Sequence, residues 1–432
     1  MAAKQGSGRL LKALAAAIAL VLAGGVASAS SPCAAQELSL PRVPWEGGPV
    51  YYESFAAAKT MGWANPSFFP VGVWYESVRD DGDVALDKGA GLNTYVELTD
   101  DSDMPLIRSH GMSALTGKPH PGMGAETVGW LIADEADMWA GPGDGRWSGL
   151  YPGQGAPCVP EKPPCGYTAM RTLKDKLPKG GDRMYYANYG KGVQFWQTPA
   201  EAGKFVNPYT DATSADMYWY TDPGICQEAG LFFKWQASEC PLAADYGAVV
   251  DRMRMLDAMD DRRQPIYAFV ELGWPSKEGT RTIDPRQTAG AVMSSLIHEA
   301  RGIVYFNHSF GGPCPSYHLL REPCYAGMRA TVTEMNRRIR ELAPVLNTQS
   351  YVHRFSRDLD TMLKCYGGSC YVFAMVRRAG PLGSHTLTLP RELASARRVE
   401  VLFENRVLPV TEGAFTDSFT AEYAYHVYRI TP

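Results

Sequence analysis

The chain has 432 residues, of which 45% are hydrophobic and 20% charged, with a net charge of −4. These are globular values, and the small negative charge argues against a nucleic-acid partner, which would require a basic face. A chain of this length exceeds one ordinary hydrophobic core, so we expect about two domains.

The N-terminus has the features of an export signal. Basic residues precede a short apolar run over residues 10–25, and the small residues Ala27 and Ala29 follow it. This order predicts a signal peptide over residues 1–29 that is removed after Ala29. The apolar run is shorter than the ~20 residues of a membrane-spanning helix, and no other segment is apolar enough to span. We therefore expect a secreted protein, extracellular or periplasmic, without a membrane partner.

Eight runs with strand character alternate with helical or loop segments through residues 30–348. Several runs are almost continuously apolar, as expected for parallel strands covered on both faces. This alternation predicts an α/β fold, a (β/α)8 TIM barrel, over residues 30–348. A doubly wound open sheet is the alternative, but no Gly-rich phosphate loop follows the first run. The runs are Phe68–Tyr75, Asn93–Thr99, Met112–Thr116, Val128–Glu135, Met184–Tyr189, Ala215–Tyr220, Pro265–Leu272 and Gly302–Ser309.

Three helices are predicted late in this region from apolar residues at helical spacing. One apolar face runs from Tyr246 to Leu256, a second from Ala289 to Ile297 after Pro285, and a third from Met328 to Leu342.

From residue 349 onward the pattern changes to short alternating runs separated by turn residues. Such runs without helices predict a small antiparallel β-sandwich over residues 349–432. The runs are Tyr351–Phe355, Thr361–Cys365, Tyr371–Val376, Thr386–Leu389, Val399–Phe403 and Tyr423–Ile430.

The nine cysteines are informative through their spacing. Cys33 is left over, and the other eight fall into near neighbours along the chain. In an exported protein this spacing predicts local disulfides, and a metal site is less favoured because C-x-x-C spacings and nearby histidine pairs are missing. The predicted bridges are Cys158–Cys165, Cys226–Cys240, Cys314–Cys324 and Cys365–Cys370.

Two of the predicted barrel strands end in glutamate. The fourth run ends in Asp134-Glu135, and the seventh carries Glu271 near its end. This order resembles clan A of the retaining glycoside hydrolases, where an acid/base glutamate follows strand four and a nucleophilic glutamate follows strand seven. The resemblance covers most of the chain, because many such barrels also carry a C-terminal sandwich. It implies that Glu135 is the acid/base, that Glu271 is the nucleophile and that no cofactor or metal is needed.

Two carboxyl groups suit glycosidic cleavage for a direct chemical reason. One group must protonate the leaving oxygen, while the other attacks the anomeric carbon from the opposite face. The acid/base requires a raised pKa, whereas the nucleophile must stay ionised. The expected reaction is hydrolysis, with retention, of a polysaccharide or glycoconjugate.

Asp134 departs from the clan pattern, in which many families have Asn at this position to bind the sugar 2-hydroxyl. An ionised Asp accepts that hydrogen bond but cannot donate one. The acids after the fourth run are also typical of a plain helix start. Two alternatives therefore stay open: a non-catalytic carbohydrate-binding or cell-envelope protein on a decayed barrel, and a hydrolase that uses aspartates such as Asp134 and Asp216.

Further residues at the ends of the runs are candidate substrate contacts. The clan resemblance implies that a tyrosine near the end of strand six bonds the nucleophile, which favours Tyr218 over Tyr220. Aromatic rings stack on the apolar faces of sugars, and amides bind their hydroxyls. The candidate substrate-binding residues are Asp134, Tyr218, Trp74, Trp274, Asn188 and Asn307, with His308 as a weaker candidate.

Overall fold

The computed structural model describes residues 37–140, 166–277 and 279–431. The predicted signal peptide, Cys33 and the predicted Cys158–Cys165 bridge lie outside these residues.

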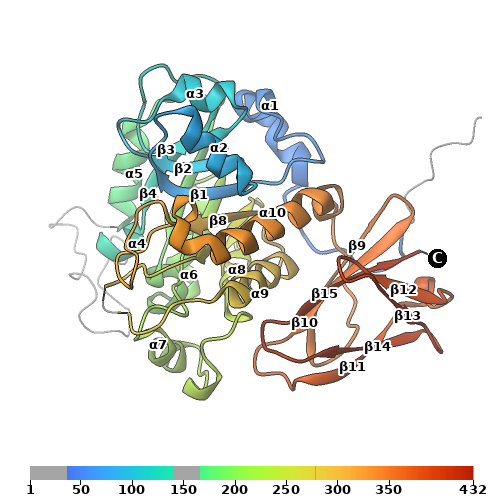
Figure 1. Cartoon of the computed structure of the whole chain (residues 1–432). Coiled ribbons are helices and arrows are strands. Elements are labelled where there is room, and N and C mark those ends of the chain that lie inside the picture. The colour runs from blue at the N-terminus through green and yellow to red at the C-terminus, as the bar shows by residue number, and fades with distance from the viewer. Residues whose placement is uncertain (1–36, 141–165, 278, 432) are drawn as a thin grey trace, which may run out of the picture. The chain divides into compact units, whose positions relative to one another are not determined.

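Eight parallel strands form a closed barrel in which each strand pairs with the next in the chain and β8 pairs with β1 (Figure 1). The predicted (β/α)8 barrel is therefore confirmed. The strands are β1 (Val71–Glu76), β2 (Thr94–Leu98), β3 (Ser113–Thr116), β4 (Thr127–Asp134), β5 (Met184–Tyr189), β6 (Ala212–Ala215), β7 (Ile266–Glu271) and β8 (Gly302–Phe306).

The sixth strand lies earlier in the chain than predicted. It comprises Ala212–Ala215, and the aromatic run assigned to it forms the loop that follows. Small residues pair here because the rings of Tyr186 and Tyr267, from the neighbouring strands, already fill the barrel interior. Trp219 leaves the ladder and stacks on Trp235 with ring centroids 5.3 Å apart.

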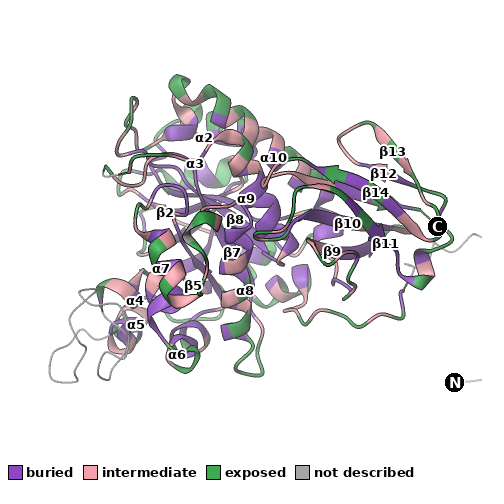
Figure 2. Cartoon of the chain, turned by 90° about the horizontal axis from the view of Figure 1, so that it is seen from below, coloured by how far each residue is buried: buried purple, intermediate pink, exposed green. Residues whose placement is uncertain are grey.

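The barrel strands are largely buried (Figure 2). The barrel has an aromatic interior and a second apolar layer between its strands and helices. Trp74, Phe269 and Phe306 lie at the carboxyl end of the interior, where the Trp74 and Phe269 rings are 5.4 Å apart. The rings close the barrel as a packed core, so any substrate site must lie above them, on the loops that follow the strands.

The three predicted helices are present, and their apolar faces are buried: α8 (Asp245–Asp257), α9 (Pro285–Ile297) and α10 (Ala326–Leu346). The other α-helices are α1 (Ala56–Thr60), α2 (Asp81–Gly89), α3 (Met104–Ser109), α4 (Ala136–Trp139), α5 (Gly166–Lys176), α6 (Pro199–Tyr209) and α7 (Ile225–Phe232). Shorter helical turns are η1 (Gly48–Ser54), η2 (Gly192–Trp196), η3 (Ala237–Glu239), η4 (Leu319–Arg321), η5 (Pro323–Tyr325) and η6 (Arg391–Leu393).

The C-terminal region consists of two antiparallel sheets, which confirms the predicted sandwich. The five-stranded sheet has the order β13-β12-β15-β10-β9, and β11 pairs with β14. Of the predicted run 351–355, only Tyr351 pairs, through isolated bridges. The strands are β9 (Leu359–Tyr366), β10 (Ser369–Val376), β11 (Gly383–Thr388), β12 (Arg398–Val401), β13 (Arg406–Pro409), β14 (Ala414–Phe419) and β15 (Tyr425–Ile430).

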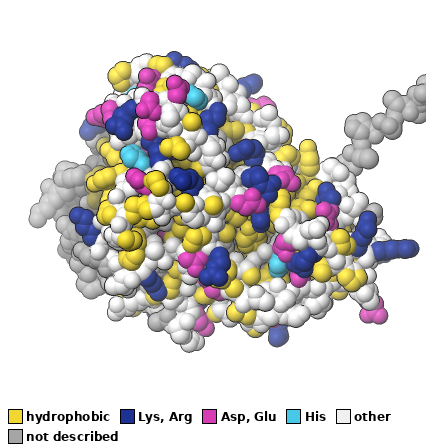
Figure 3. All heavy atoms as spheres, in the orientation of Figure 1, with side chains coloured by type: hydrophobic (Ala, Val, Ile, Leu, Met, Phe, Trp, Pro, Cys, Tyr) yellow, Lys and Arg dark blue, Asp and Glu magenta, His cyan; other side chains and the backbone are white. Residues whose placement is uncertain are grey.

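Three of the predicted disulfides are confirmed: Cys226–Cys240, Cys314–Cys324 and Cys365–Cys370. Within the described residues, no helix is both long and apolar enough to cross a membrane. On the face shown in Figure 3, basic and acidic side chains are interspersed, so this face has no basic stripe.

Candidate active site

Besides Glu76 at the end of β1, acidic residues lie at the ends of β4, β6 and β7, on the same side of the barrel. Asp134 is the last residue of β4 and Glu135 follows it; Asp216 follows β6, and Glu271 is the last residue of β7. Because all strands are parallel, these residues lie at the carboxyl edge of the barrel, where such barrels assemble their active sites.

Glu135 occupies a left-handed backbone conformation, with φ of 51°, at the turn between β4 and α4. This conformation is uncommon for a residue with a side chain and often marks a functional position. Gly190, which directly follows β5, leaves room for the carboxylate because it has no side chain. A Cβ at this position would lie 3.1 Å from Glu135 Oε1 and 2.3 Å from Met138 Sδ. The half-buried Glu135 side chain is thus held above the end of the strand.

Burial, followed by the nearby charges of Asp134 and Asp137, raises the pKa of Glu135 to about 7. Asp137 is fully buried and accepts hydrogen bonds from the backbone N–H groups of Gly190, at 3.1 Å, and Val193, at 2.8 Å. Its carboxylate fixes the loop after β5, so it belongs to the framework around Glu135. A carboxyl group with a raised pKa can deliver a proton near neutral pH.

Asp216 is the acid that contacts Glu135. Their carboxyl groups are close enough to affect each other's ionisation, and Tyr218 Oη donates to Asp216 Oδ2 at 2.7 Å. Burial, followed by the charge of Glu135, holds the pKa of Asp216 well above its usual value. Two carboxyl groups this close do not both ionise easily, which favours a state with one proton on the pair.

Asp134 and Asn188 form a pair at the mouth of the barrel. Asn188 Nδ2 donates to Asp134 Oδ1 at 2.9 Å, while Asn188 Oδ1 accepts from Ser214 Oγ at 2.6 Å. Desolvation and then the charge of Asp216 raise the pKa of Asp134. Asn188 itself is buried, so it orients Asp134 instead of facing solvent.

Glu271 has a different environment, since it is only 1% exposed and surrounded by donors. The Tyr220 backbone N–H donates to its Oε1 at 2.8 Å and Tyr246 Oη donates to the same oxygen at 2.7 Å, while Thr221 Oγ1 donates to Oε2. Burial raises its pKa to about 7, although all three donors lower it. These donors favour a carboxylate over a carboxylic acid.

Sequence reasoning missed most of these donors. The sequence pattern marks Tyr246 only as part of the apolar face of α8, and it does not mark Thr221. Tyr218, which the clan resemblance favoured as the partner of the nucleophile, donates to Asp216, whereas Tyr220 contacts Glu271 through its backbone. A hydroxyl on an otherwise apolar helix face was the one available signal.

A pocket of about 290 Å³ lies at this edge of the barrel, and Glu135, Asp216 and Glu271 are not among the residues that line it. Tyr218, Thr221 and Phe306 line it, together with the loop residues Asp222, Pro223, Pro275 and Ser276. Tyr218 is bonded to Asp216 and Thr221 is bonded to Glu271. The pocket is therefore separated from Asp216 and from Glu271 by one hydroxyl-bearing side chain each.

The predicted aromatic contacts are placed less favourably. Trp74 is 8% exposed and packs inside the barrel, while the half-buried Trp274 lies against the backbone of Gly279 and Gly312. Tyr75, near the end of β1, has its side chain exposed to solvent, at 41%. Of the predicted aromatic residues, Tyr218 is therefore the one that lines the pocket.

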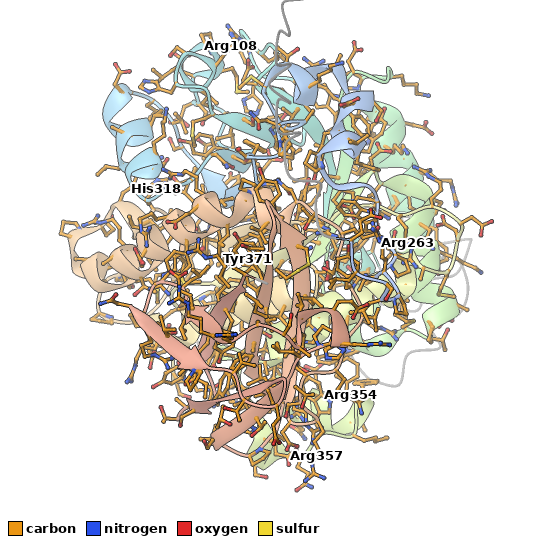
Figure 4. All side chains as sticks on the ribbon, turned by 90° about the vertical axis from the view of Figure 1, so that its right-hand side faces the viewer. Arg108, Arg263, His318, Arg354, Arg357 and Tyr371 are labelled. Atoms are coloured by element: carbon orange, nitrogen blue, oxygen red, sulfur yellow. A yellow bond between two sulfur atoms is a disulfide. The ribbon has the colours of Figure 1, made fainter. Side chains whose placement is uncertain are left out.

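Asn307 and His308 follow β8 as expected, but both are engaged within the protein. Asn307 donates to the buried Glu76, which also binds His318 (labelled in Figure 4) and lies 3.4 Å from Arg321. A His308 ring nitrogen lies 3.1 Å from the Tyr75 carbonyl oxygen. This network braces the ends of β1 and β8. Within the described residues, no group of three or more His, Cys, Asp or Glu residues is arranged to hold a metal ion.

No protein-family model matches the chain, and no curated protein matches it. Among solved structures, AmyP in complex with maltose is 10% identical, with a TM-score of 0.47 over 87% of this chain and 98% of AmyP. A family 39 glycoside hydrolase from Bacteroides cellulosilyticus WH2 is 11% identical, with a TM-score of 0.46 over 85% and 82% of the two chains. AbfB, a family 51 α-L-arabinofuranosidase from Bifidobacterium longum, is 12% identical, with a TM-score of 0.44 over 84% and 97%. Likenesses this distant carry no conclusion about activity.

Proposed function

We propose that this chain is a glycoside hydrolase whose active site lies at the carboxyl ends of β4, β6 and β7. The observation that carries the proposal is the pocket lined by Tyr218 and Thr221. Its two hydroxyls bond Asp216 and Glu271, and Asp216 in turn contacts Glu135. A substrate in this pocket would lie one side chain away from Asp216 and from Glu271, and glycosidic cleavage requires two such acid groups to reach the scissile bond.

The two environments support different roles. Glu135 acts as the acid/base, because burial and the charges of Asp134 and Asp137 raise its pKa to about 7. Glu271 acts as the nucleophile, because three donors stabilise its ionised form. A retaining double displacement follows: Glu271 forms a glycosyl-enzyme while Glu135 protonates the leaving oxygen, and Glu135 then activates water.

The proposed substrate is a polysaccharide or glycoconjugate outside the cytoplasm. The rings of Tyr218 and Phe306 in the pocket suit the apolar face of a sugar. The predicted signal peptide supports export, and three disulfides are typical of an oxidising compartment.

One observation favours a second candidate, a carbohydrate-binding protein without catalytic activity. Glu271 is almost completely buried, and both of its oxygens already accept hydrogen bonds. If substrate binding does not displace Thr221 from Oε2, the carboxylate cannot reach an anomeric carbon. Such a protein would bind sugars and hydrolyse none.

A screen of the purified mature protein on polysaccharides and aryl glycosides tests the proposal, with the anomer of the first product followed by NMR. Hydrolysis with retained configuration is expected. Of two variants prepared in parallel, Glu271→Ala should remove it and Glu135→Ala should slow it. Retention of full activity in both variants would overturn the assignment of the site. Sugar binding without hydrolysis would establish the second candidate instead.

A further inference from the structure

We propose that the C-terminal sandwich positions the nucleophile of the barrel, with Glu422 and Tyr220 as the positioning residues. This inference rests on the proposed role of Glu271.

Glu422 reaches from the sandwich into the barrel. It lies in the turn between β14 and β15, where its Oε1 accepts from Tyr220 Oη at 3.1 Å and its Oε2 accepts from the Ala243 backbone N–H at 2.7 Å. Its two donors, Tyr220 and Ala243, lie near opposite ends of the segment that joins β6 to α8. The half-buried carboxylate of Glu422 thus bonds both ends of this segment.

The same two ends carry the donors of Glu271. The Tyr220 backbone N–H donates to Glu271 Oε1, and Tyr246, three residues beyond Ala243, donates its hydroxyl to the same oxygen. The rings of Tyr220 and Tyr246 are nearly parallel, at 19°, with centroids 6.5 Å apart. A shift of Tyr220 would therefore move a donor directly away from Glu271.

The turn that carries Glu422 is closely seated against the barrel. A Cβ on Gly290, in α9, would lie 2.7 Å from the Tyr423 Cβ and 2.9 Å from the Ala243 Cβ. Only a glycine allows this approach without displacement of the turn. This close packing of the turn against α9 fixes the position of Glu422, which directly precedes Tyr423.

A second anchor lies at the start of α8. Arg378 Nε donates to the buried Asp245 Oδ1 at 2.9 Å, and the guanidinium carbon lies 3.5 Å from the ring centroid of Trp235. Asp245 directly precedes Tyr246 in the chain. Two separate contacts from the sandwich therefore brace the residues that hold Glu271.

The consequence for catalysis concerns the ionisation of Glu271. Donors to a carboxylate lower its pKa, so weakening the Tyr220 N–H bond would raise that pKa. A displaced or protonated nucleophile is slow, and small misplacements of reacting groups cost large factors in rate.

The test compares the wild type with Glu422→Gln, Tyr220→Phe and the double variant on an aryl glycoside that the enzyme hydrolyses. Glu412→Gln is the matched control, because Glu412 is an exposed carboxylate of the same sandwich. We expect each single variant to lower kcat by about 10-fold with little change in KM. The double variant should be no slower than either single one, because both remove the same hydrogen bond.

Two readouts separate positioning from simple loss of stability. The acid limb of the kcat/KM profile should move to higher pH in Glu422→Gln, whereas loss of a negative charge alone would move it to lower pH. Exchange of the Tyr220 backbone amide should also become faster in Glu422→Gln and in Tyr220→Phe, but not in Glu412→Gln. The exchange measurement needs no activity, and Tyr220→Phe serves if Glu422→Gln does not fold.

Unchanged amide exchange and an unmoved acid limb, with Glu271→Gln inactive, would overturn the positioning role and leave the proposed function intact. Full activity in Glu271→Gln would instead overturn the proposed function, and with it any catalytic consequence of Glu422.

Discussion

Glu135, after β4, and Glu271, at the end of β7, differ in their burial and in the groups around their carboxylates. Glu135 is half-buried among like charges, from Asp134, Asp137 and Asp216, on a turn with a left-handed backbone. Glu271 is fully buried and meets only donors, from Tyr220, Thr221 and Tyr246. The pKa of each is raised to about 7, yet for different reasons. One site favours keeping a proton available, whereas the other favours a fixed carboxylate, so a similar pKa does not imply a similar role.

The largest expected effect comes from removing the carboxylate at β7. Glu271→Ala should lower kcat/KM by about 10⁴-fold or more on every substrate, because no glycosyl-enzyme forms without the nucleophile. Added azide should restore turnover and give a product of inverted configuration. Glu53→Ala, which removes an exposed glutamate, is the control and should behave as wild type. Rescue with retained configuration would mean that the roles are swapped.

Removing the carboxylate at β4 should have a smaller effect that depends on the leaving group. Glu135→Ala should slow substrates with poor leaving groups by about 10²–10⁴-fold, because their oxygen must be protonated. An activated aryl glycoside should give a burst followed by slow release, which azide accelerates with retained configuration. Equal loss on good and poor leaving groups would contradict a role in proton transfer.

Glu271 and Glu135 should contribute differently to the pH dependence of the protein's free energy of unfolding. Burial raises the pKa of Glu271 from 4.5 to about 7, so the folded state binds its proton more tightly than the unfolded state. The free energy of unfolding should therefore fall as pH rises from about 4.5 to 7. In Glu271→Gln this contribution is lost, so the variant should gain about 2–3 kcal/mol relative to wild type between pH 5 and 8.

Glu135→Gln, in its half-exposed site, should gain less over the same pH range. Urea unfolding at several pH values measures both variants. Equal gains in the two variants would mean that their burial does not differ as described.

The smallest expected effect concerns the acid that contacts Glu135. Asp216→Asn leaves Glu135 as the one ionisable group of this pair and offers it an amide donor, so the pKa of Glu135 should lie below the upper pKa of the wild-type pair. The alkaline limb of the kcat/KM profile should then move to lower pH, with kcat at neutral pH lower by about 10-fold. Complete loss of activity with trapping of substrate on residue 216 in the wild type would favour the hydrolase that uses aspartates.

The barrel could be predicted from sequence because parallel strands buried on both faces leave long apolar runs. Strand six could not, since its small residues fit around Tyr186 and Tyr267, and the aromatic run beside it resembles a strand more closely. Strand β14 was missed because Asp417 occupies a buried position and breaks the apolar alternation. Its charge is compensated by Arg406, at 3.0 Å, which lies on β13.

The candidate site was predictable only at the level of strand ends. Alternation along the chain indicates which acids follow which strands, so Glu135 and Glu271 could be named. The partners that distinguish them come from loops and from α8, and they meet only through long-range packing: Tyr246 is 25 residues from Glu271 and Tyr220 is 51 residues away. Spacing along the chain carries no signal for such contacts.

The most direct test of the account is to trap the intermediate. A 2-deoxy-2-fluoro aryl glycoside of the sugar that the screen identifies slows the second step, so a glycosyl-enzyme accumulates and the labelled peptide can be located by mass spectrometry. The account predicts one label per chain, on Glu271, and faster trapping in the wild type than in Glu135→Gln. A label on Asp216 or Asp134, or steady hydrolysis with no labelled peptide, would contradict it.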